Sequence, residues 1–567
     1  MARKRTNIFK QLFFILTPYW KGEKKWEAWG LLSIVVIFLI LLSLNDAYKT
    51  YIQKWLFNSL SAQNYQLFYQ FVLLAVVMLS LSVIITALGL YFVDKLGVSW
   101  RRWFNINLLD RYLKNKAYYN MGLYSDVDNP DQRLAEDLNA FTQESIQLLA
   151  TVGASIFTLI TFTGVLWTIS PLLVLSVVAY AFVGNVIILW FMRILVKVNF
   201  LNIKYQANYR YNLIHVRNNI ESIAFYKGEP HEGSLLKRNF HILIENLFRL
   251  IKIKRNIMFA SKTYILFSVL LPFIIIGPRI LSGQAHVGLL VQAIAVFTEI
   301  LTDLSIIIAQ FPDLSTYGAN IQRLAKFVTG MQAKPPRKAT LVDYHQNGKF
   351  DFKNVTVQTP DLKKTLVEDL NLTIEPGARL IIRGPSGCGK SSLLRAVAGL
   401  WRIGEGEIIT PNMKDVMFLP QRPYMILGSL REQLIYPNLD SDITNDELFE
   451  ALKEVNLSDL PDRVGGLDTV LKWADVLSLG EQQRIMFVRL FLNNPKYAIL
   501  DESSSALDED NEEIVYSKLM NSEITYVSVG HRSSLLKFHD YELLLDLKHG
   551  WKVFPVEQEK NSSRESH

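Results

Sequence analysis

Cysteine and charge are both scarce in this chain. Cys388 is the only cysteine among 567 residues, so no disulfide can form within the chain, and an oxidised secreted scaffold is excluded. Charged residues make up 20% of the sequence, whereas hydrophobic residues make up 50% and aromatic residues 12%. This composition also excludes a disordered or low-complexity protein. A chain of this length is expected to hold about two to four domains.

The two parts of the chain differ in charge. Residues 1–330 contain 32 Lys and Arg against 18 Asp and Glu, which gives +14, and the remainder contains 28 against 35, which gives −7. The two values sum to the net charge of +7. A basic part joined to an acidic part is one pattern of nucleic-acid-binding proteins. The positions of the basic residues favour membrane topology instead, so we expect no nucleic-acid partner.

Long apolar runs are confined to the basic part. A membrane-spanning helix needs about 20 mostly apolar residues, because the hydrocarbon core is about 30 Å thick. Six runs approach this length, at about 27–47, 70–93, 146–169, 172–196, 256–280 and 287–311. Six such runs are too many for a soluble fold, so the sequence predicts a six-helix membrane domain over residues 1–330. The first run is too long for a signal peptide and lacks a small-residue cleavage site.

The basic residues alternate between the two sides of the predicted spans. They cluster at 3–25, 95–133 and 197–255, before the first span and in the second and fourth connections. The opposite connections hold only Lys49, Lys54 and Arg279. Because basic residues concentrate on the cytoplasmic side, both termini are expected to be cytoplasmic.

The two inner connections are long and have helical patterns, for example at 99–119 and 199–253. We expect their helices to continue well beyond the membrane. Turn-forming residues interrupt them once each, at 128–131 and 227–230. These two turns are predicted to be docking points for a cytosolic module.

The last predicted span carries a polar stripe. Its members lie at offsets of 7, 11 and 18 residues, which at about 100° per residue places them within about 20° of one line. They are Gln292, Glu299, Asp303 and Gln310. Ionisable residues at membrane depth are costly and usually face a cavity or a partner. The stripe is therefore interpreted either as the acidic wall of a substrate pathway or as one side of a buried pair with Lys262 or Arg193.

A soluble α/β pattern follows a polar, proline-containing segment at 331–349, which is interpreted as a linker. Residues 384–391, G-P-S-G-C-G-K-S, match the phosphate-binding loop and lie between a predicted strand and a predicted helix. Its glycines allow backbone N–H groups to surround phosphate oxygens, and the helix N-terminus favours an anion. The candidate nucleotide-binding residues of this loop are Gly384, Pro385, Ser386, Gly387, Cys388, Gly389, Lys390, Ser391 and Ser392.

Two acidic residues end a later apolar strand, 496–500. Asp501, together with Ser391, is suited to hold Mg²⁺, and Glu502 is suited to polarise an attacking water. His531 follows a third strand, 524–529, and is a candidate for contact with the γ-phosphate. Phosphoryl transfer needs mainly charge neutralisation and an aligned nucleophile, which these groups supply.

The run 477–484, L-S-L-G-E-Q-Q-R, resembles the signature of ATP-binding cassette (ABC) proteins. Together with the phosphate loop, Gln421, 501–508 and His531, it has the order and spacing of a complete cassette, predicted over 350–556. The resemblance implies that ATP and Mg²⁺ are bound. It adds Gln421 to the catalytic and metal-binding candidates, and it adds Ser478, Gly480, Glu481 and Asp508 to the nucleotide-binding candidates. Residues 557–567 are expected to be a disordered tail.

The membrane part resembles the SbmA/BacA-like domain and is similar to the peroxisomal ABCD half-transporters. The residues that carry this resemblance are 100–103, 118–119, 128–133 and 223–229. It implies an exporter-type ABC fold, with an α-helical membrane domain joined to an α/β nucleotide-binding domain. Two copies are expected to pair as a homodimer in a bacterial inner membrane, with each ATP between one phosphate loop and the partner's signature.

Relatives with this arrangement suggest an ATP-hydrolysing transporter for bulky hydrophilic cargo, such as cobalamin or peptides. A lipid or acyl-CoA transporter is one alternative, and a proton-coupled permease with a regulatory cassette is another. The sequence departs from the usual pattern at two positions. Leu479 replaces the first signature glycine, and Thr359 stands where many cassettes have a tyrosine that stacks on adenine. Weak discrimination against GTP is therefore expected.

Overall fold

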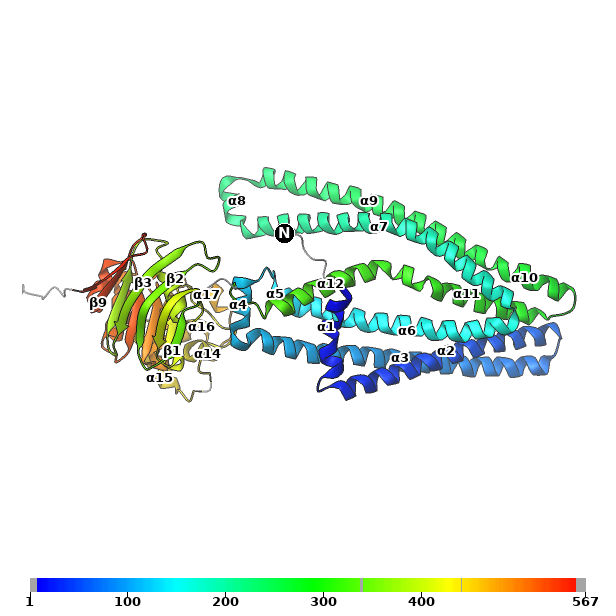
Figure 1. Ribbon diagram of the computed structural model, residues 1–567, viewed down its shortest axis with the longest axis horizontal. Helices are drawn as coiled ribbons and strands as arrows, with labels where there is room; N and C mark the ends of the chain where they lie inside the picture. Colours follow the sequence, from blue (N-terminus) through cyan, green and yellow to red (C-terminus); the bar gives the residue numbers. More distant parts are fainter. Residues whose placement is uncertain (1–7, 337–339, 440, 557–567) are drawn as a thin grey trace, which may run out of the picture. The chain divides into compact units, whose positions relative to one another are not determined.

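The computed structural model describes residues 8–336, 340–439 and 441–556 (Figure 1). It separates into two compact units. One comprises Met1–Tyr118 and Asp126–Gln332, and the other comprises Tyr119–Ser125 and Ala333–His567. We call them the helical unit and the α/β unit. The tail expected at 557–567 lies outside the described residues.

The described part of the helical unit contains six helices that are long and apolar enough to cross a membrane, as predicted. Its elements are α1 (Ile8–Lys21), α2 (Lys25–Ser61), α3 (Tyr65–Leu113), the 3₁₀ turn η1 (Lys114–Lys116), α4 (Ala117–Tyr124), α5 (Pro130–Gln132), the π-helical turn η2 (Arg133–Asp137), α6 (Leu138–Ile169), α7 (Pro171–Asn218), α8 (Ile220–Tyr226), α9 (Glu229–Ser268), α10 (Leu270–Leu281), α11 (Val287–Ala309) and α12 (Phe311–Gly330). Of α4, only Ala117 and Tyr118 belong to the helical unit, and the remainder belongs to the α/β unit.

Three helices continue well past the apolar runs, as expected from their patterns. The helices α3, α7 and α9 contain 49, 48 and 40 residues, and α7 and α9 run side by side (Figure 1). The turns expected at 128–131 and 227–230 are present, between α4 and α5 and between α8 and α9. Asn129 and Lys227 adopt left-handed φ angles of 43° and 52°, and each is followed by a proline-containing helix start. Pro171 begins α7 in the same way, where its missing N–H costs nothing.

The helix α2 is longer than the predicted span. Lys49 and Lys54, expected in an outer connection, lie inside α2, and Arg279 lies inside α10. Lys49 forms an ion pair with Asp46 one turn earlier, and its Nζ donates to Oγ of Ser82 on α3 at 3.2 Å. The prediction that these three basic residues lie in connections between helices is therefore wrong.

The core of the helical unit forms where α2, α6, α7, α10 and α11 meet. Leu166, Leu173, Ile276 and Phe297 are fully buried in this cluster. The outward faces of the same helices remain apolar and exposed, as a lipid-facing surface requires. The buried cluster therefore fixes the polar stripe of α11 against α2 and α6.

The α/β unit contains two sheets. Its strands are β1 (Asp343–Gln346), β2 (Phe350–Gln358), β3 (Thr365–Ile374), β4 (Arg379–Arg383), β5 (Gly404–Thr410), β6 (Val416–Leu419), β7 (Tyr497–Asp501), β8 (Thr525–Val529), β9 (Tyr541–Leu545) and β10 (Trp551–Pro555). The smaller sheet has the order β1-β5-β2-β3, and the larger has the order β10-β9-β4-β8-β7-β6. From β9 to β6, neighbouring strands of the larger sheet are parallel.

Helices cover the larger sheet and close two apolar cores. They are α13 (Lys390–Val397), α14 (Leu430–Ile435), α15 (Asn445–Glu454), α16 (Leu460–Val464), α17 (Trp473–Val476), α18 (Leu479–Asn493) and α19 (Glu509–Met520), with 3₁₀ turns η3 (Met413–Asp415) and η4 (Ser533–Phe538). One core joins β2, β3, β4 and α13 around Phe350 and Leu380. The other joins α18 and α19 to β7 and β8 around Phe487 and Tyr516. Together they hold the carboxyl ends of the parallel strands at one edge.

Two segments join this unit from outside the predicted cassette boundaries. The strand β1 lies inside the range interpreted as a linker, and it pairs with β5 in parallel from Asp343 opposite Glu407 to Gln346 opposite Thr410. The segment Tyr119–Ser125 also belongs to this unit. Tyr124 packs against a small apolar cluster formed by Leu366, Trp401 and Ile403.

Candidate functional site

The loop between β4 and α13 has a backbone that requires glycine. Gly384 and Gly389 have φ angles of 150° and 108°. A Cβ atom on Gly384 would lie 2.4 Å from the carbonyl oxygen of Leu545, and one on Gly389 would lie 2.9 Å from Cβ of Leu366. Both distances are too short for packed atoms, so only glycine fits. The loop ends at the N-terminus of α13, where the helix dipole favours an anion.

The ammonium group of Lys390 lies inside this loop. Its residue is 6% exposed, and Nζ donates to the carbonyl oxygens of Gly384 and Pro385 at 2.9 Å and 3.1 Å. Neutral carbonyls hold the cation without cancelling its charge, so the charge stays available to phosphate oxygens. Cys388 is buried in the adjoining apolar core, where its small side chain serves for packing.

A half-buried carboxylate lies against the first turn of α13. Oγ of Ser391 donates to Oδ1 of Asp501 at 3.1 Å. Burial raises the pKa of Asp501, and the hydrogen bond from Ser391 offsets only part of that rise. A site that disfavours a bare carboxylate is stabilised by a bound cation, and oxygen ligands are those Mg²⁺ prefers. The pair therefore fits Mg²⁺ held next to a nucleotide phosphate.

Side chains from three adjacent strand ends meet at Glu502. Gln421, after β6, donates from Nε2 to Oε2 of Glu502 at 2.7 Å, and Nε2 of His531, after β8, lies 3.4 Å from Oε1. Glu502 follows β7, the strand between them. Its φ of 48° is in the left-handed region, and its N–H donates to the carbonyl of Val529 at 3.1 Å. This strained but fixed backbone directs the carboxylate at the strand ends.

The predicted signature residues begin α18. Ser478 is the N-cap, and it forms a reciprocal capping box with Glu481, with bonds of 3.3 Å and 2.8 Å. Burial raises the pKa of Glu481, but hydrogen bonds from Arg463 and Ser478 outweigh burial and hold the pKa below its usual value. Gly480 allows the segment at Ala506 of the same chain to pack closely, because a Cβ atom on residue 480 would lie 3.1 Å from the carbonyl oxygen of Ala506.

Two further side chains fix the segment 505–508, and sequence reasoning did not single them out. Gln483 donates from Nε2 to Oγ of Ser505 at 3.2 Å and accepts from the N–H of Ala506 at 2.9 Å. Arg532 donates to the carbonyls of Ser505 and Leu507 at 3.3 Å and 3.0 Å. In the sequence, only their positions indicate these residues: Gln483 lies within the signature run, and Arg532 follows His531.

A buried acid anchors Arg532. Glu512 is 2% exposed, and its carboxylate accepts from Arg532 at 3.2 Å, from Ser504 at 2.7 Å and from Ser534 at 3.1 Å. It lies on α19, whose N-cap is Asp508. Asp508 accepts from the N–H of Asn511 at 2.8 Å, and that bond lowers the pKa of its carboxyl. No sequence motif marks Glu512.

The predicted residues form two separate groups within one chain. The loop 384–392, Asp501, Glu502, Gln421 and His531 gather at the carboxyl ends of the parallel strands. In the described part of the chain, the side-chain hydrogen bonds of Ser478 and Glu481 run to each other and to Arg463, and none reaches the loop. The signature group therefore does not complete the loop site of its own chain.

The position expected to stack on adenine is a polar turn. Oγ1 of Thr359 donates to Oδ1 of Asp361 at 2.6 Å and accepts from the N–H of Lys364 at 3.1 Å. The indole of Trp401 donates to the carbonyl of Gln358 at 2.7 Å and is buried. The threonine hydroxyl is thus used within its own turn.

Comparisons with known proteins agree with this geometry. A family model described as ABC transporter transmembrane region 2 matches residues 15–281, and one described as ABC transporter matches residues 367–505. An uncharacterized ABC transporter ATP-binding protein of Synechocystis sp. is 38% identical over 94% of this chain and 83% of its own length. The chain belongs to the ABC transporter family.

Two further relatives carry more specific names. The chloroplastic ABC transporter D family member 2 of Arabidopsis thaliana is 34% identical over 95% of this chain and 86% of its own. The human lysosomal cobalamin transporter ABCD4 is 29% identical over 98% of each chain. The transporter is thus similar to ABCD-family half-transporters, and its ABC domain makes it an ATP-hydrolysing transporter.

In the membrane domain of the transporter, the polar stripe of α11 contacts α2 and α6. Buried Gln292 donates from Nε2 to Oγ1 of Thr50 at 3.4 Å. Asp303 accepts at Oδ1 from Oγ of Ser155 at 3.0 Å. Gln310 lies half-buried at the junction of α11 and α12. The stripe is therefore only partly enclosed by polar neighbours.

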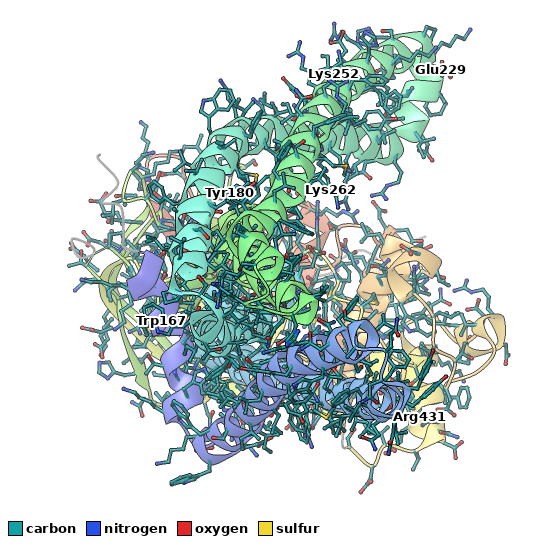
Figure 2. All side chains as sticks on the ribbon, turned by 90° about the vertical axis from the view of Figure 1, so that its right-hand side faces the viewer. Trp167, Tyr180, Glu229, Lys252, Lys262 and Arg431 are labelled. Atoms are coloured by element: carbon teal, nitrogen blue, oxygen red, sulfur yellow. The ribbon has the colours of Figure 1, made fainter. Side chains whose placement is uncertain are left out.

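Glu299 faces a cavity of about 510 Å³. Asp46 and Lys49 of α2 line the same cavity, so it holds two carboxylates and one ammonium group. Lys262, considered as a partner for the stripe, is exposed on α9 and forms no ion pair with any described residue (Figure 2). The side chain of Arg193 lies outside the described residues. Lys49 is thus the basic residue of the described cavity lining.

Proposed function

We propose that this protein works as a homodimer in a bacterial inner membrane, where ATP hydrolysis moves a bulky hydrophilic cargo across the bilayer. The observation that carries the proposal is the convergence of Gln421 and His531 on Glu502, beside a complete phosphate loop. A cassette that had only a regulatory, nucleotide-sensing role would not need a carboxylate held in this way.

Each residue of the loop site has a proposed role. Bound ATP with Mg²⁺ supplies the phosphoryl group and the charges that these residues recognise. Lys390 leaves its two carbonyl partners to contact the β- and γ-phosphates, and Ser391 and Asp501 hold the metal ion. Glu502 orients and deprotonates water, Gln421 fixes the carboxylate, and His531 contacts the γ-phosphate. All of these residues lie on one chain.

A second copy completes the site. Ser478 and Gly480 present the first turn of α18 without reaching the loop of their own chain. A head-to-tail pair would place this turn, with Glu481 and Asp508 nearby, against the nucleotide of the partner. Each ATP is then held by both copies, and its hydrolysis releases them.

Two turns of the long helices are proposed to transmit this closure. Next to the turn at 227–230, Phe225 and Tyr226 are 84% and 87% exposed. Exposed aromatic residues of this kind are typical of a docking surface. At the other turn, Tyr124 already packs on Leu366 within the α/β unit. Both inner turns, and therefore both termini, are placed in the cytoplasm in this proposal.

The cargo is proposed to be polar or cationic. Two of the three charged groups that line the α2–α11 cavity are carboxylates, Asp46 and Glu299, and Asp303 lies on the same face of α11. The resemblance to SbmA/BacA-like domains supports peptides, and the name of the human relative supports cobalamin. An acyl-CoA would bring several phosphate charges against these carboxylates, so the lipid alternative is disfavoured.

One experiment separates this proposal from a proton-coupled permease. The transporter and its Glu502→Gln variant are reconstituted in oriented vesicles with labelled cobalamin or a proline-rich peptide. ATP should drive cargo movement only in the unchanged protein. Movement by Glu502→Gln under a pH gradient alone would support the permease, and movement of neither cargo with ATP would overturn the proposed cargo class.

A further inference from the structure

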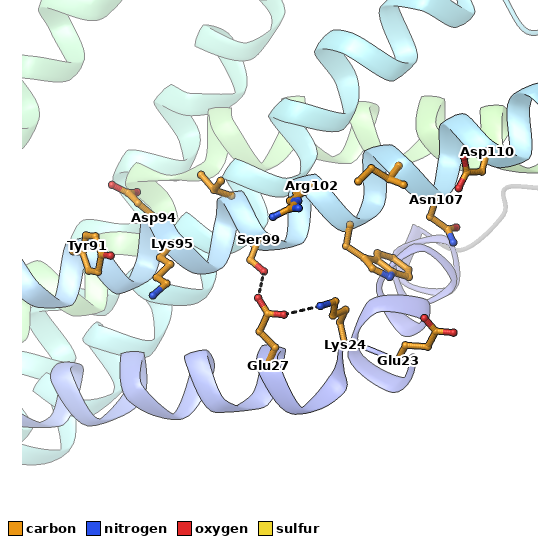
Figure 3. A pocket seen from close by; sticks show the side chains of 13 residues that line it. Glu23, Lys24, Glu27, Tyr91, Asp94, Lys95, Ser99, Arg102, Asn107 and Asp110 are labelled. Carbon is orange, nitrogen blue, oxygen red and sulfur yellow. Dashed lines mark hydrogen bonds and ion pairs between the residues drawn. The ribbon is translucent and has the colours of Figure 1, made fainter. Parts of the chain in front are cut away.

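A groove runs along one face of α3 beside the start of α2. It has a volume of about 780 Å³ and is lined from Tyr91 to Asp110, over more than five helical turns (Figure 3). Residues before and within the first turn of α2 form its other wall. This groove contains none of the residues assigned above to ATP or to cargo.

The groove lies where the apolar run of α2 begins and the apolar run of α3 ends. Glu27 stands at the start of the apolar run of α2, and Asp94 follows that of α3. Tryptophans surround this level: Trp20 packs edge to face on Trp29 with ring centroids 5.5 Å apart, and Trp26 is 80% exposed. Tryptophan is enriched where lipid head groups meet water. The groove therefore opens at the head-group level of the bilayer.

One chain of polar contacts crosses the groove and is internally neutral. Nζ of Lys24 lies 3.4 Å from Oε2 of Glu27, and Oγ of Ser99 donates to Oε1 of Glu27 at 2.8 Å (Figure 3). These contacts tie the start of α2 to α3. They leave the remaining charges of the groove available.

The remaining charges are of both signs. Lys95 and Arg102 lie seven residues apart on α3, which places them on one face and about 10 Å apart along the axis. Asp94 and Asp110 of α3 line the same groove, and so does Glu23, just before α2, so three carboxylates accompany the two cations. Among the residues that the structure describes, none of these five forms an ion pair, and Nζ of Lys95 instead lies 5.8 Å from the ring centroid of Tyr91.

We propose that this groove binds a phospholipid with an ethanolamine head group. The lipid phosphate is held by Lys95 and Arg102, and its ammonium group by Asp94 or Asp110. Tyr91, which is exposed at the end of the apolar run of α3 and lines the groove, contacts the lipid chains. An anionic lipid without an ammonium group would satisfy the two cations but leave the carboxylates facing it unpaired, so the mixed charge selects a zwitterion.

The test measures lipid retained by the full-length protein. The purified protein is incubated with phosphatidylethanolamine or phosphatidylglycerol, and bound lipid is counted by native mass spectrometry. The double variant Lys95→Ala/Arg102→Ala should retain roughly 25-fold less phosphatidylethanolamine, at about fivefold for each basic residue removed. The matched control is Arg101→Ala, because Arg101 is exposed on α3 but does not line the groove. The control should retain the lipid fully.

A second variant tests the head-group preference. Asp94→Asn/Asp110→Asn should lower retention of phosphatidylethanolamine and raise that of phosphatidylglycerol. Equal losses in the control and the double variant would overturn the proposal, as would equal binding of the two lipids by the unchanged protein. Displacement of the lipid by water-soluble glycerophosphoethanolamine at matched concentration would also overturn it, because the groove would then bind a soluble ligand.

Discussion

The guanidinium group of Arg532 lies 3.2 Å from the buried carboxylate of Glu512 and at the same time donates to the carbonyl of Leu507 at 3.0 Å. This arrangement connects the residue after His531 to the segment 505–508, which we propose faces the partner copy. A change at the γ-phosphate is thereby linked to the dimer surface. Arg532 is a positioning residue in this scheme, because its side chain holds Glu512 and the carbonyls of Ser505 and Leu507.

Arg532→Lys should lower ATP hydrolysis about tenfold with little change in ATP affinity. Lysine keeps the charge near Glu512 but cannot make the forked contacts of arginine. Steady-state ATPase assays and nucleotide-binding titrations separate the two effects. Lys537→Ala removes a nearby exposed ion pair with Glu513 and should change neither value. A loss of ATP affinity equal to the loss of turnover would contradict the positioning role.

Lys390→Ala should abolish ATP-dependent transport while leaving a dimer assembled in detergent. The substitution removes the ammonium group that the phosphate loop encloses. The Glu502→Gln variant, measured in parallel, should still bind ATP but hydrolyse it about 10² to 10⁴ times more slowly. Size-exclusion chromatography with light scattering measures the dimer. Transport that persists in Lys390→Ala would exclude this loop as the source of energy.

Replacing both exposed aromatic residues of α8, Phe225→Ala/Tyr226→Ala, should uncouple hydrolysis from transport. The loop site is intact in this variant, so ATP is still hydrolysed, but the docking contact at the turn 227–230 is lost. Cargo moved per ATP consumed should fall several-fold. Phe248→Ala is the control, because Phe248 is an exposed aromatic residue of α9 away from this turn. An unchanged ratio of cargo to ATP would exclude docking through α8.

Glu299→Gln should slow transport of a cationic cargo more than that of a neutral one. The substitution keeps the shape of the cavity but removes the lining carboxylate that is not ion-paired with Lys49, so the attraction of the cavity for a cation falls. Transport rates of a cationic peptide and of cobalamin in the same vesicles measure the difference. Equal slowing of both cargoes would indicate a structural role for Glu299.

Stability should fall on acidification because of His539. Burial lowers the pKa of His539 to about 4. Its Nδ1 donates to the carbonyl of Leu535 at 2.7 Å. Its buried Nε2 has no hydrogen-bond partner among the described residues, so a proton added there would bring an unpaired charge into the core. Above about pH 6.5 the folded and unfolded forms are both neutral, so no penalty applies. Between about pH 6.5 and 4 only the unfolded form binds the proton, and about 3 kcal/mol of stability is lost.

His539→Gln isolates this contribution, because glutamine keeps a donor but does not titrate. Thermal unfolding of the full-length protein and the variant should be followed from pH 7 to pH 4.5. The difference between their midpoints should change across that range in favour of the variant at low pH. Parallel curves would show that other groups cause the acid sensitivity.

The six spans and the loop site were predictable because their signals are local. An apolar run of about 20 residues and a strand–loop–helix motif each depend on residues close in sequence. The strand β1 was not predictable, because its four residues lie in a polar segment and are ordered by pairing with β5. A short strand has no pattern of its own to distinguish it from a linker.

Other parts of the site depend on contacts between distant segments. Glu512 is one of many acidic residues in the α/β unit, and only tertiary packing brings it to Arg532 and Ser504. Lys49 was expected in a connection because the predicted span ends at residue 47, but its partner Ser82 lies on another helix. The groove beside α3 likewise depends on the packing of α2 against α3, which includes the contact of Ser99 with Glu27.

The single thiol of the chain has a practical consequence. Cys388 is enclosed by the apolar core beneath the phosphate loop, so the unmodified sequence serves as a nearly silent background for thiol-reactive spin labels and fluorophores. One cysteine introduced at an exposed position such as Tyr226 then reports a single distance per pair of copies. Conformational cycles can be followed this way with every nucleotide-contacting residue left as it is.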